Sequence, residues 1–223
     1  MALNGSRCIT CVDGCANMVK YGRTKSGNQR YICKSCNKTR VADYFYNACK
    51  ADTNHNIILL TKEGVGIRST ARILKISTTT LLKRIVIIAG HIQKPIICYG
   101  KEYEVDEMCT YIKHKRNPIW IVLALERESK RVVSFAVGKR TNKTLSRVLE
   151  TLRLSEAKRI FTDRLKNYRY LIDGELHCVK RFGTNRIERK NLTLRTHLKR
   201  LNRRTICFSK SLVVLVSILK IYF

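Results

Sequence analysis

Beyond residue 100 the chain changes to short runs rich in apolar, β-branched and aromatic side chains, a pattern that is typical of β-strands. Three such runs cover residues 103–112, 119–126 and 131–137, and the turns between them are short. Helical spacing then begins and covers about residues 141–154. We therefore expect a three-stranded meander that is followed by a helix.

The pattern changes several times more before the C-terminus. Short apolar runs at residues 159–162 and 176–180 predict two further strands, and Asp173-Gly174 predicts a turn between them. A helix is expected over about residues 185–204. The apolar segment 212–223 predicts a helical stripe, which we expect in the core, with an oligomer contact as the alternative. The order β-β-β-α-β-(α)-β-α predicts a mixed α/β sheet layered with helices.

Residues 47–94 carry short helical patterns that meet at a tight turn. One helix ends near Gly64, and the small Ala71 lets the next helix approach a last one, which begins after the capping residue Ser77. This pattern predicts a helix-turn-helix, whose second helix enters the major groove of DNA, and a plain helical hairpin is the alternative. The residues that we expect to contact DNA are Ser77, Thr79, Lys83 and Arg84.

Paired cysteines mark the first part of the chain. Cys8-x-x-Cys11 and Cys33-x-x-Cys36 each let one tight turn present two sulfurs to the same ion, and four thiolates suit tetrahedral Zn²⁺. The basic segment between the pairs has glycines at its turns and predicts a hairpin. Residues 1–46 are therefore expected to form a zinc ribbon, with buried structural thiols as the alternative.

Composition adds a strong charge signal. The 223 residues include 45 Lys and Arg against 16 Asp and Glu, a net charge of +29, and 44% are hydrophobic, which is enough for a core. This excess indicates a polyanionic partner, and DNA or RNA is the leading expectation. No stretch reaches the roughly 20 apolar residues that span a bilayer, so a membrane partner is not expected.

Residues 1–6 lack the apolar region of a signal peptide, so we expect a reducing compartment. In that setting the ten cysteines stay as thiols or bind metal. Cys15, which lies between the two pairs, is expected to be a spare thiol rather than a zinc ligand.

The few acidic residues are concentrated, since four of the sixteen fall in residues 102–107. On a strand, Glu104 and Asp106 share one face. Asp163 ends a short apolar run, and Glu188 is the last acid of the chain, in a basic helical segment. Carboxylates bind hard ions such as Mg²⁺, and two such ions about 4 Å apart catalyse phosphodiester chemistry. On spacing alone, the alternative that each acid balances a neighbouring Arg or Lys stays equally open.

Four segments around these acids form a recognisable set. They are Glu104-Val-Asp106-Glu107, Thr162-Asp163, Arg186-Ile-Glu188-Arg189-x-Asn191-x-x-Leu194-Arg195-x-His197-Leu198 and Phe208-Ser209-Lys210-Ser211. The set resembles the catalytic signature of the DDE transposases of the insertion sequence one family, in which a zinc ribbon and a helix-turn-helix also come first. The resemblance implies an RNase H-like catalytic domain over residues 95–223. It also implies a triad of Asp106, Asp163 and Glu188 that binds Mg²⁺ or Mn²⁺, and a basic residue, Arg195, that holds DNA.

The same resemblance implies a function. A transposase of this kind binds the terminal inverted repeats of its element, cleaves one strand at each end and attacks target DNA with the freed 3′-hydroxyl. The implied partners are double-stranded DNA at the element ends and at the target, and further copies of the chain in an oligomer on DNA. The implied location is cytoplasmic, at the bacterial nucleoid. The alternatives are a non-catalytic DNA-binding regulator and an inactive relic of a transposase.

Overall fold

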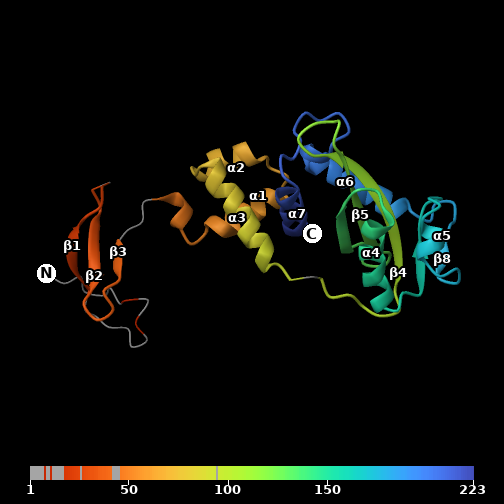
Figure 1. Ribbon diagram of the computed structural model, residues 1–223, viewed down its shortest axis with the longest axis horizontal. Helices are drawn as coiled ribbons and strands as arrows, with labels where there is room; N and C mark the ends of the chain where they lie inside the picture. Colours follow the sequence, from red (N-terminus) through yellow and green to blue (C-terminus); the bar gives the residue numbers. More distant parts are fainter. Residues whose placement is uncertain (1–7, 9–10, 12–17, 26, 42–45, 94) are drawn as a thin grey trace. The chain divides into compact units, whose positions relative to one another are not determined.

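The computed structural model describes residues 8, 11, 18–25, 27–41, 46–93 and 95–223 (Figure 1). Cys15 lies outside the described residues. The chain forms two compact units, Met1–Thr53 and Asn54–Phe223.

The first unit contains a small antiparallel sheet in the order β1-β2-β3. β1 (Met18–Arg23) and β2 (Gln29–Cys33) form the hairpin that was predicted between the cysteine pairs, and β3 (Thr39–Val41) extends it. The turn of the hairpin includes Gly27, whose φ of 83° is a left-handed conformation that glycine adopts without strain. A 3-10 turn, η1 (Asn47–Cys49), follows.

Three helices precede the large sheet: α1 (Thr53–Lys62), α2 (Ile67–Leu74) and α3 (Thr78–His91). Lys75 ends α2 with a φ of 51°, so a non-glycine residue adopts the left-handed conformation of this turn. Ser77 caps α3, because its hydroxyl accepts a hydrogen bond of 3.1 Å from the backbone N–H of Thr80. The buried side chains of these helices include Ile57, Ala71, Leu81, Ile85 and Ile88. The predicted helix-turn-helix is present.

The second unit is built on a five-stranded sheet in the order β6-β5-β4-β7-β8. β4 (Glu102–Tyr111), β5 (Pro118–Glu126) and β6 (Val132–Gly138) form the expected antiparallel meander. β7 (Arg159–Phe161) pairs in parallel with β4, and β8 (His177–Cys178) pairs in parallel with β7. A mixed sheet with this strand order is the RNase H-like arrangement that the resemblance implied.

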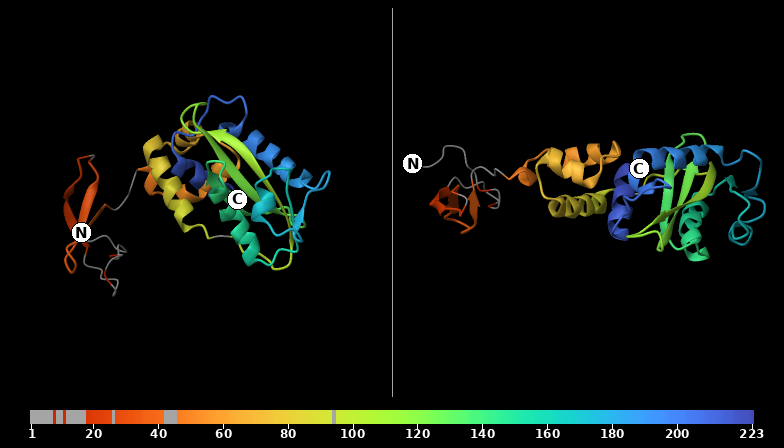
Figure 2. Two further views of the ribbon diagram at one scale, coloured as in Figure 1. Left: turned by 45° about the vertical axis from the view of Figure 1, so that its right-hand side comes forward. Right: turned by 90° about the horizontal axis from the view of Figure 1, so that it is seen from above.

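Helices cover both faces of the sheet. α4 (Asn142–Leu154) lies on one face and α6 (Asn185–His197) on the other, as the right-hand view of Figure 2 shows. Successive side chains of β4 point to opposite faces of the sheet. Tyr103 and Val105 therefore pack in the core that includes α4 and the short helix α5 (Tyr168–Leu171). The intervening residues of β4 face α6.

Two predicted elements of the second unit, a helix and a strand, are shorter than expected. α6 ends at His197 instead of near residue 204, because Leu198 leaves the helical conformation and the chain continues into a 3-10 turn, η2 (Lys199–Leu201). Burial of Leu198 and Leu201 anchors this turn. β8 has only two residues because its neighbour β7, with three, offers little backbone to pair with.

The apolar C-terminal segment forms α7 (Leu212–Tyr222), which packs against α3. Of the predicted stripe, Leu215 and Leu219 are buried and Val216 is partly buried, but Leu212 is 40% exposed; Ile218 joins the buried side instead. Within the described part of the chain, none of the helices has the length and apolar character that crossing a membrane requires.

Candidate functional site

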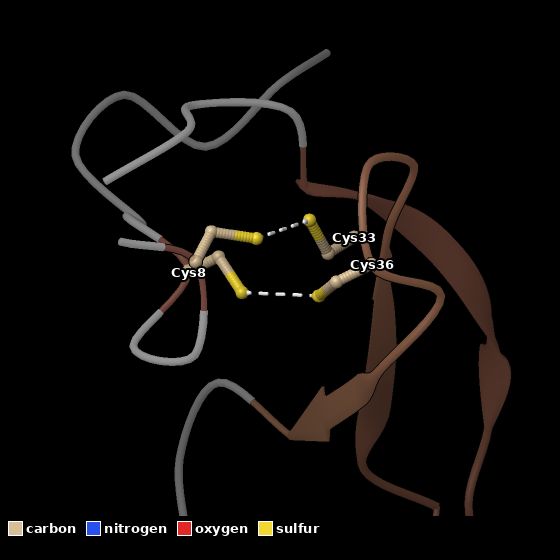
Figure 3. Close-up of side chains that lie close together, drawn as sticks. Cys8, Cys33 and Cys36 are labelled. Atoms are coloured by element: carbon tan, nitrogen blue, oxygen red, sulfur yellow. Dashed lines mark hydrogen bonds between the residues drawn. The ribbon is translucent and has the colours of Figure 1, made fainter. Parts of the chain in front are cut away.

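The four cysteines of the first unit lie together as the sequence predicts. Cys8 Sγ lies 3.6 Å from Cys36 Sγ, and Cys11 Sγ lies 3.8 Å from Cys33 Sγ. All four sulfurs lie within 4.8 Å of one another, and Figure 3 shows two pairs that face each other. A tetrahedral Zn²⁺ with Zn–S bonds of about 2.3 Å places its sulfurs about 3.8 Å apart, so this donor set fits zinc.

An acidic cleft lies beside the sheet of the second unit. It has a volume of about 720 Å³ and is lined by carboxylates and by basic and amide side chains. The lining residues that carry these groups are Asp106, Glu107, Glu188, Asn191, Arg195, Asn202 and Arg203. Carboxylate oxygens of Asp106, Glu107 and Asp163 lie within 4.8 Å of one another. Residues that are far apart in the sequence therefore form one group of oxygen donors.

The unequal lengths of β4 and β7 bring these acids together. The pairing of the two strands ends at Glu104 with Phe161, while β4 continues to Tyr111. Beyond that point one edge of β4 is not paired with β7, and Asp163 follows the end of β7 by two residues. Asp163 therefore lies beside the edge of β4 that carries Asp106.

Asp106 is held from the α6 side. The side-chain amide of Asn191 donates a 2.8 Å hydrogen bond to Asp106 Oδ2, and the backbone N–H of Glu107 also donates to this carboxylate. The pKa of Asp106 is raised to about 6, mainly by burial and also by the nearby charges of Asp163 and Glu188, against hydrogen bonds from Glu107 and Asn191 that lower it. A carboxyl group in these surroundings has a strong preference for a cation.

Glu107 is the member of the group that sequence reasoning did not select. Its side chain is only 1% exposed, and Oε1 lies 3.9 Å from Arg140 Nε but has no hydrogen-bond partner among the described residues. The pKa of Glu107 is raised to about 7, mainly by burial and then by the charge of Asp163, while Arg140 lowers it. Its position in the acidic segment 102–107 was the only available signal.

Glu188 and Arg195 project from α6 at the same cleft. Glu188 is exposed and accepts a 2.9 Å hydrogen bond from the hydroxyl of Thr184, and it is not among the carboxylates within 4.8 Å of one another. Arg195 is half-buried, and its Nε has no hydrogen-bond partner among the described residues. Burial and then the charge of Arg203 lower the pKa of the Arg195 guanidinium. A phosphate group in the cleft could accept a hydrogen bond from the Arg195 guanidinium.

Residues 96–223, more than half of the chain, match the family model described as IS1 transposase. The chain belongs to the IS1 transposase family. Residues 44–85 match a second model, described as the InsA C-terminal domain, which coincides with the helix-turn-helix.

Two relatives of this transposase are similar over 108 residues, or 48% of the chain. The insertion element IS1 protein InsB of Shigella flexneri is 40% identical, and the match covers 82% of that protein. The IS1 2 protein InsB of Escherichia coli (strain K12) is 39% identical, with 65% of its length matched.

Two solved structures are also similar to parts of the chain. The HTLV-2 integrase catalytic core domain in complex with magnesium is 16% identical with a TM-score of 0.32, and covers 57% of this chain and 86% of its own. The simian T-cell lymphotropic virus intasome in complex with the PP2A regulatory subunit B56 gamma is 16% identical with a TM-score of 0.38. The match covers 73% of this chain and 66% of the intasome chain.

In this IS1-family transposase, Glu104 connects the strand of Asp106 to the helix of Glu188. Its fully buried carboxylate accepts 3.0 Å hydrogen bonds from the backbone N–H groups of Arg186 and Ile187, at the N-terminus of α6. Nη1 of Arg186 lies 3.2 Å from the same carboxylate, and Nε of Arg127 lies 3.4 Å away. A negative charge at a helix N-terminus is favourable, so Glu104 fixes the start of α6 on β4.

The predicted DNA-contacting residues of the transposase lie at the start of α3. Ser77, Thr79 and Lys83 are exposed, although the Ser77 hydroxyl is engaged as the helix cap. Arg84 is half-buried, and its guanidinium donates a 3.0 Å hydrogen bond to Asn54 Oδ1. Thr79 and Lys83 are therefore the residues whose side chains can best test the recognition role.

Proposed function

We propose that this transposase cleaves and joins DNA strands at the acidic cleft, with Asp106, Asp163 and Glu188 as its catalytic carboxylates. The observation that carries the proposal is the meeting of Asp106, on β4, with Asp163, just beyond the end of β7, because Asp106 lines a cleft that Glu188 and Arg195 also line. A cleft with both carboxylates and arginines suits a reaction in which cations and a phosphodiester come together.

The oxygen donors of the cleft fit Mg²⁺ or Mn²⁺. When bound, such an ion activates the attacking oxygen and stabilises the leaving oxygen of the phosphodiester. Asp106 and Asp163 would hold it, and Asn191 keeps the Asp106 carboxylate oriented through its 2.8 Å hydrogen bond. Arg195 and Arg203 line the same cleft and would bind the phosphate backbone.

Glu188 completes the proposed triad by a change of rotamer. Its carboxylate is turned toward the Thr184 hydroxyl, but the side chain is exposed and lines the cleft. Exposed side chains exchange rotamers on the picosecond to nanosecond timescale. The carboxylate can therefore turn toward Asp106, whose pKa its charge already raises.

We propose three functional modules along the chain. Residues 1–46 would form a zinc ribbon with Cys8, Cys11, Cys33 and Cys36 as the Zn²⁺ ligands. Residues 47–94 would bind the terminal inverted repeats through the helix-turn-helix, with base contacts from Ser77, Thr79, Lys83 and Arg84. Residues 95–223 would carry out catalysis on element ends and target DNA, as an oligomer of the chain on DNA. The net charge of +29 supports a polyanionic partner for all three.

The test separates DNA binding from cleavage. DNA from the ends of the element that encodes the chain is titrated for binding by fluorescence anisotropy and for Mg²⁺-dependent nicking. Asp106→Asn, Asp163→Asn and Glu188→Gln should each lose nicking and keep or slightly improve affinity, because removing negative charge lowers repulsion toward phosphate. Arg195→Gln should weaken both.

Glu175→Gln is the matched control, since Glu175 is an exposed acid that does not line the cleft. It should leave both readouts unchanged. Nicking that persists in the Asp106 or Asp163 variant would refute the assignment of the cleft. DNA binding without nicking by the parent would favour the non-catalytic regulator.

A further inference from the structure

Glu107 reaches the acidic group from the opposite face of the sheet. Side chains alternate along β4, so Asp106 faces α6 while Glu107 faces the side of α4 and α5. Both carboxylates nevertheless have an oxygen within 4.8 Å of one from Asp163. This is possible because β7 ends before it would cover the edge of β4 at these two residues.

The surroundings of Glu107 contain more buried polar atoms than hydrogen bonds. The hydroxyl of the fully buried Tyr168 lies beside the Glu107 carboxylate and lowers its pKa by hydrogen bonding, but Glu107 Oε1 itself has no hydrogen-bond partner among the described residues. The cationic group beside Glu107 is Arg140, whose Nε lies 3.9 Å from Glu107 Oε1. The Arg140 guanidinium also stacks over Trp120, with its carbon 4.4 Å from the ring centre. Burying polar atoms without partners is unfavourable, and such groups commonly indicate an absent ion or water.

We infer that Glu107 is a fourth carboxylate of the catalytic metal centre and shares a divalent cation with Asp163. This inference rests on the proposed function in one respect, that the cleft binds Mg²⁺ or Mn²⁺. Two ions about 4 Å apart need several oxygen ligands, and carboxylates from both faces of β4 can hold ions on either side of Asp163. Asp106 would serve the side of α6, and Glu107 would serve the side of α5.

The competing explanation is that Glu107 only neutralises Arg140. The two explanations predict different effects on binding of Mn²⁺, which electron paramagnetic resonance measures on the zinc-loaded full chain without DNA or turnover. If Glu107 is a metal ligand, the Glu107→Gln protein should bind Mn²⁺ at least about tenfold more weakly than the parent, or should bind one ion fewer. Glu107→Asp should recover part of the affinity, since it keeps the carboxylate.

Glu102→Gln is the matched control. Glu102 lies on the same strand, is 38% exposed and forms an ion pair of 4.0 Å with Arg127, outside the acidic group. This variant should bind Mn²⁺ as the parent does. Thermal unfolding of each variant, followed by the fluorescence of Trp120, shows whether the sheet is intact.

A second variant keeps the test decisive if Glu107→Gln disturbs the fold. Arg140→Gln removes the cation that competes for Glu107, and Arg140 is 40% exposed and so tolerates the change. It should tighten Mn²⁺ binding about fivefold if Glu107 is a ligand. The gain should disappear in the double variant with Glu107→Gln, because it acts through that carboxylate.

The outcomes separate this inference from the proposed function. Parental Mn²⁺ affinity in Glu107→Gln, together with loss of binding in Asp163→Asn, would overturn the role of Glu107 and leave the catalytic centre in place. A gain for Arg140→Gln that persists without Glu107 would also overturn it. Absence of Mn²⁺ binding by the parent protein would overturn both proposals.

Discussion

Glu104 supplies the most sharply defined stability prediction of this transposase. The carboxylate is 0% exposed and accepts hydrogen bonds from two backbone N–H groups, both at 3.0 Å, and from Arg186 at 3.2 Å. Glu104→Ala removes every acceptor, so two backbone N–H groups at the start of α6 lose their partner, and Arg186 and Arg127 lose the carboxylate that they share. Glu104→Gln keeps one acceptor oxygen but places an amide N–H₂ against donors.

The magnitude follows from these contacts. Removing one partner of a buried, hydrogen-bonded charge pair costs about 3 to 5 kcal/mol. We therefore expect Glu104→Ala to lower the free energy of unfolding by about 4 kcal/mol. Glu104→Gln should lower it by about 2 kcal/mol, the value of one charged hydrogen bond. The same substitutions should weaken nicking, because the N-terminus of α6 carries Glu188.

Urea unfolding followed by fluorescence isolates this effect, because Trp120 is the single tryptophan of the chain and lies on β5. Glu102→Gln is the control, since its ion pair is partly exposed and worth at most about 1 kcal/mol. Hydrogen exchange at the amides of Arg186 and Ile187 should also accelerate in the Glu104 variants. A Glu104→Ala protein within 0.5 kcal/mol of the parent, roughly the scatter of surface substitutions, would refute this reasoning.

Three further predictions concern the other parts of the chain. Elemental analysis should find one Zn²⁺ per chain. A strong chelator should unfold the first unit, because structural zinc contributes about 10 to 16 kcal/mol to the stability of small domains. A first unit that stays folded without zinc would contradict the zinc site. Thr79→Ala and Lys83→Ala should each weaken binding to element-end DNA by about 1 to 3 kcal/mol and affect random DNA less, whereas equal losses on both DNAs in titrations at fixed salt would remove the recognition role. Without divalent metal, the free energy of unfolding should fall as the pH rises from about 4 to 7, because the raised pKa of Asp106 makes the folded state bind protons more tightly than the unfolded state. Urea unfolding at several pH values should give a loss of about 2 to 3 kcal/mol from Asp106, and an Asp106→Asn protein with an unchanged pH slope would contradict this.

The local patterns in the sequence predict much of this fold. Alternation along residues 103–112 places Glu104 and Asp106 on one face, and both contact α6 in the structure. The C-x-x-C spacing predicts the four-sulfur cluster, because each pair needs only its own turn. The turn before Ser77 is present although Lys75 stands where glycine is common, since Lys75 adopts the left-handed conformation.

Features that depend on tertiary pairing are not visible in the sequence. The same alternation places Glu107 away from Asp106, and only the early end of β7 lets both approach Asp163. In the sequence, Glu104 cannot be distinguished from the other acids of the segment 102–107. Its role depends on α6, whose N-terminal backbone N–H groups donate to the carboxylate. Helical spacing continues past His197, but the anchoring of Leu198 and Leu201 ends α6 there.

Strand transfer tests the central claim most directly. A pre-cleaved element end with a free 3′-hydroxyl is incubated with supercoiled plasmid, Mg²⁺ and either the parent protein or Asp163→Asn, and joined products are counted. The claim that the acidic cleft is the catalytic centre predicts Mg²⁺-dependent joining by the parent and none by the variant at equal DNA occupancy. Equal joining by the two proteins would contradict it.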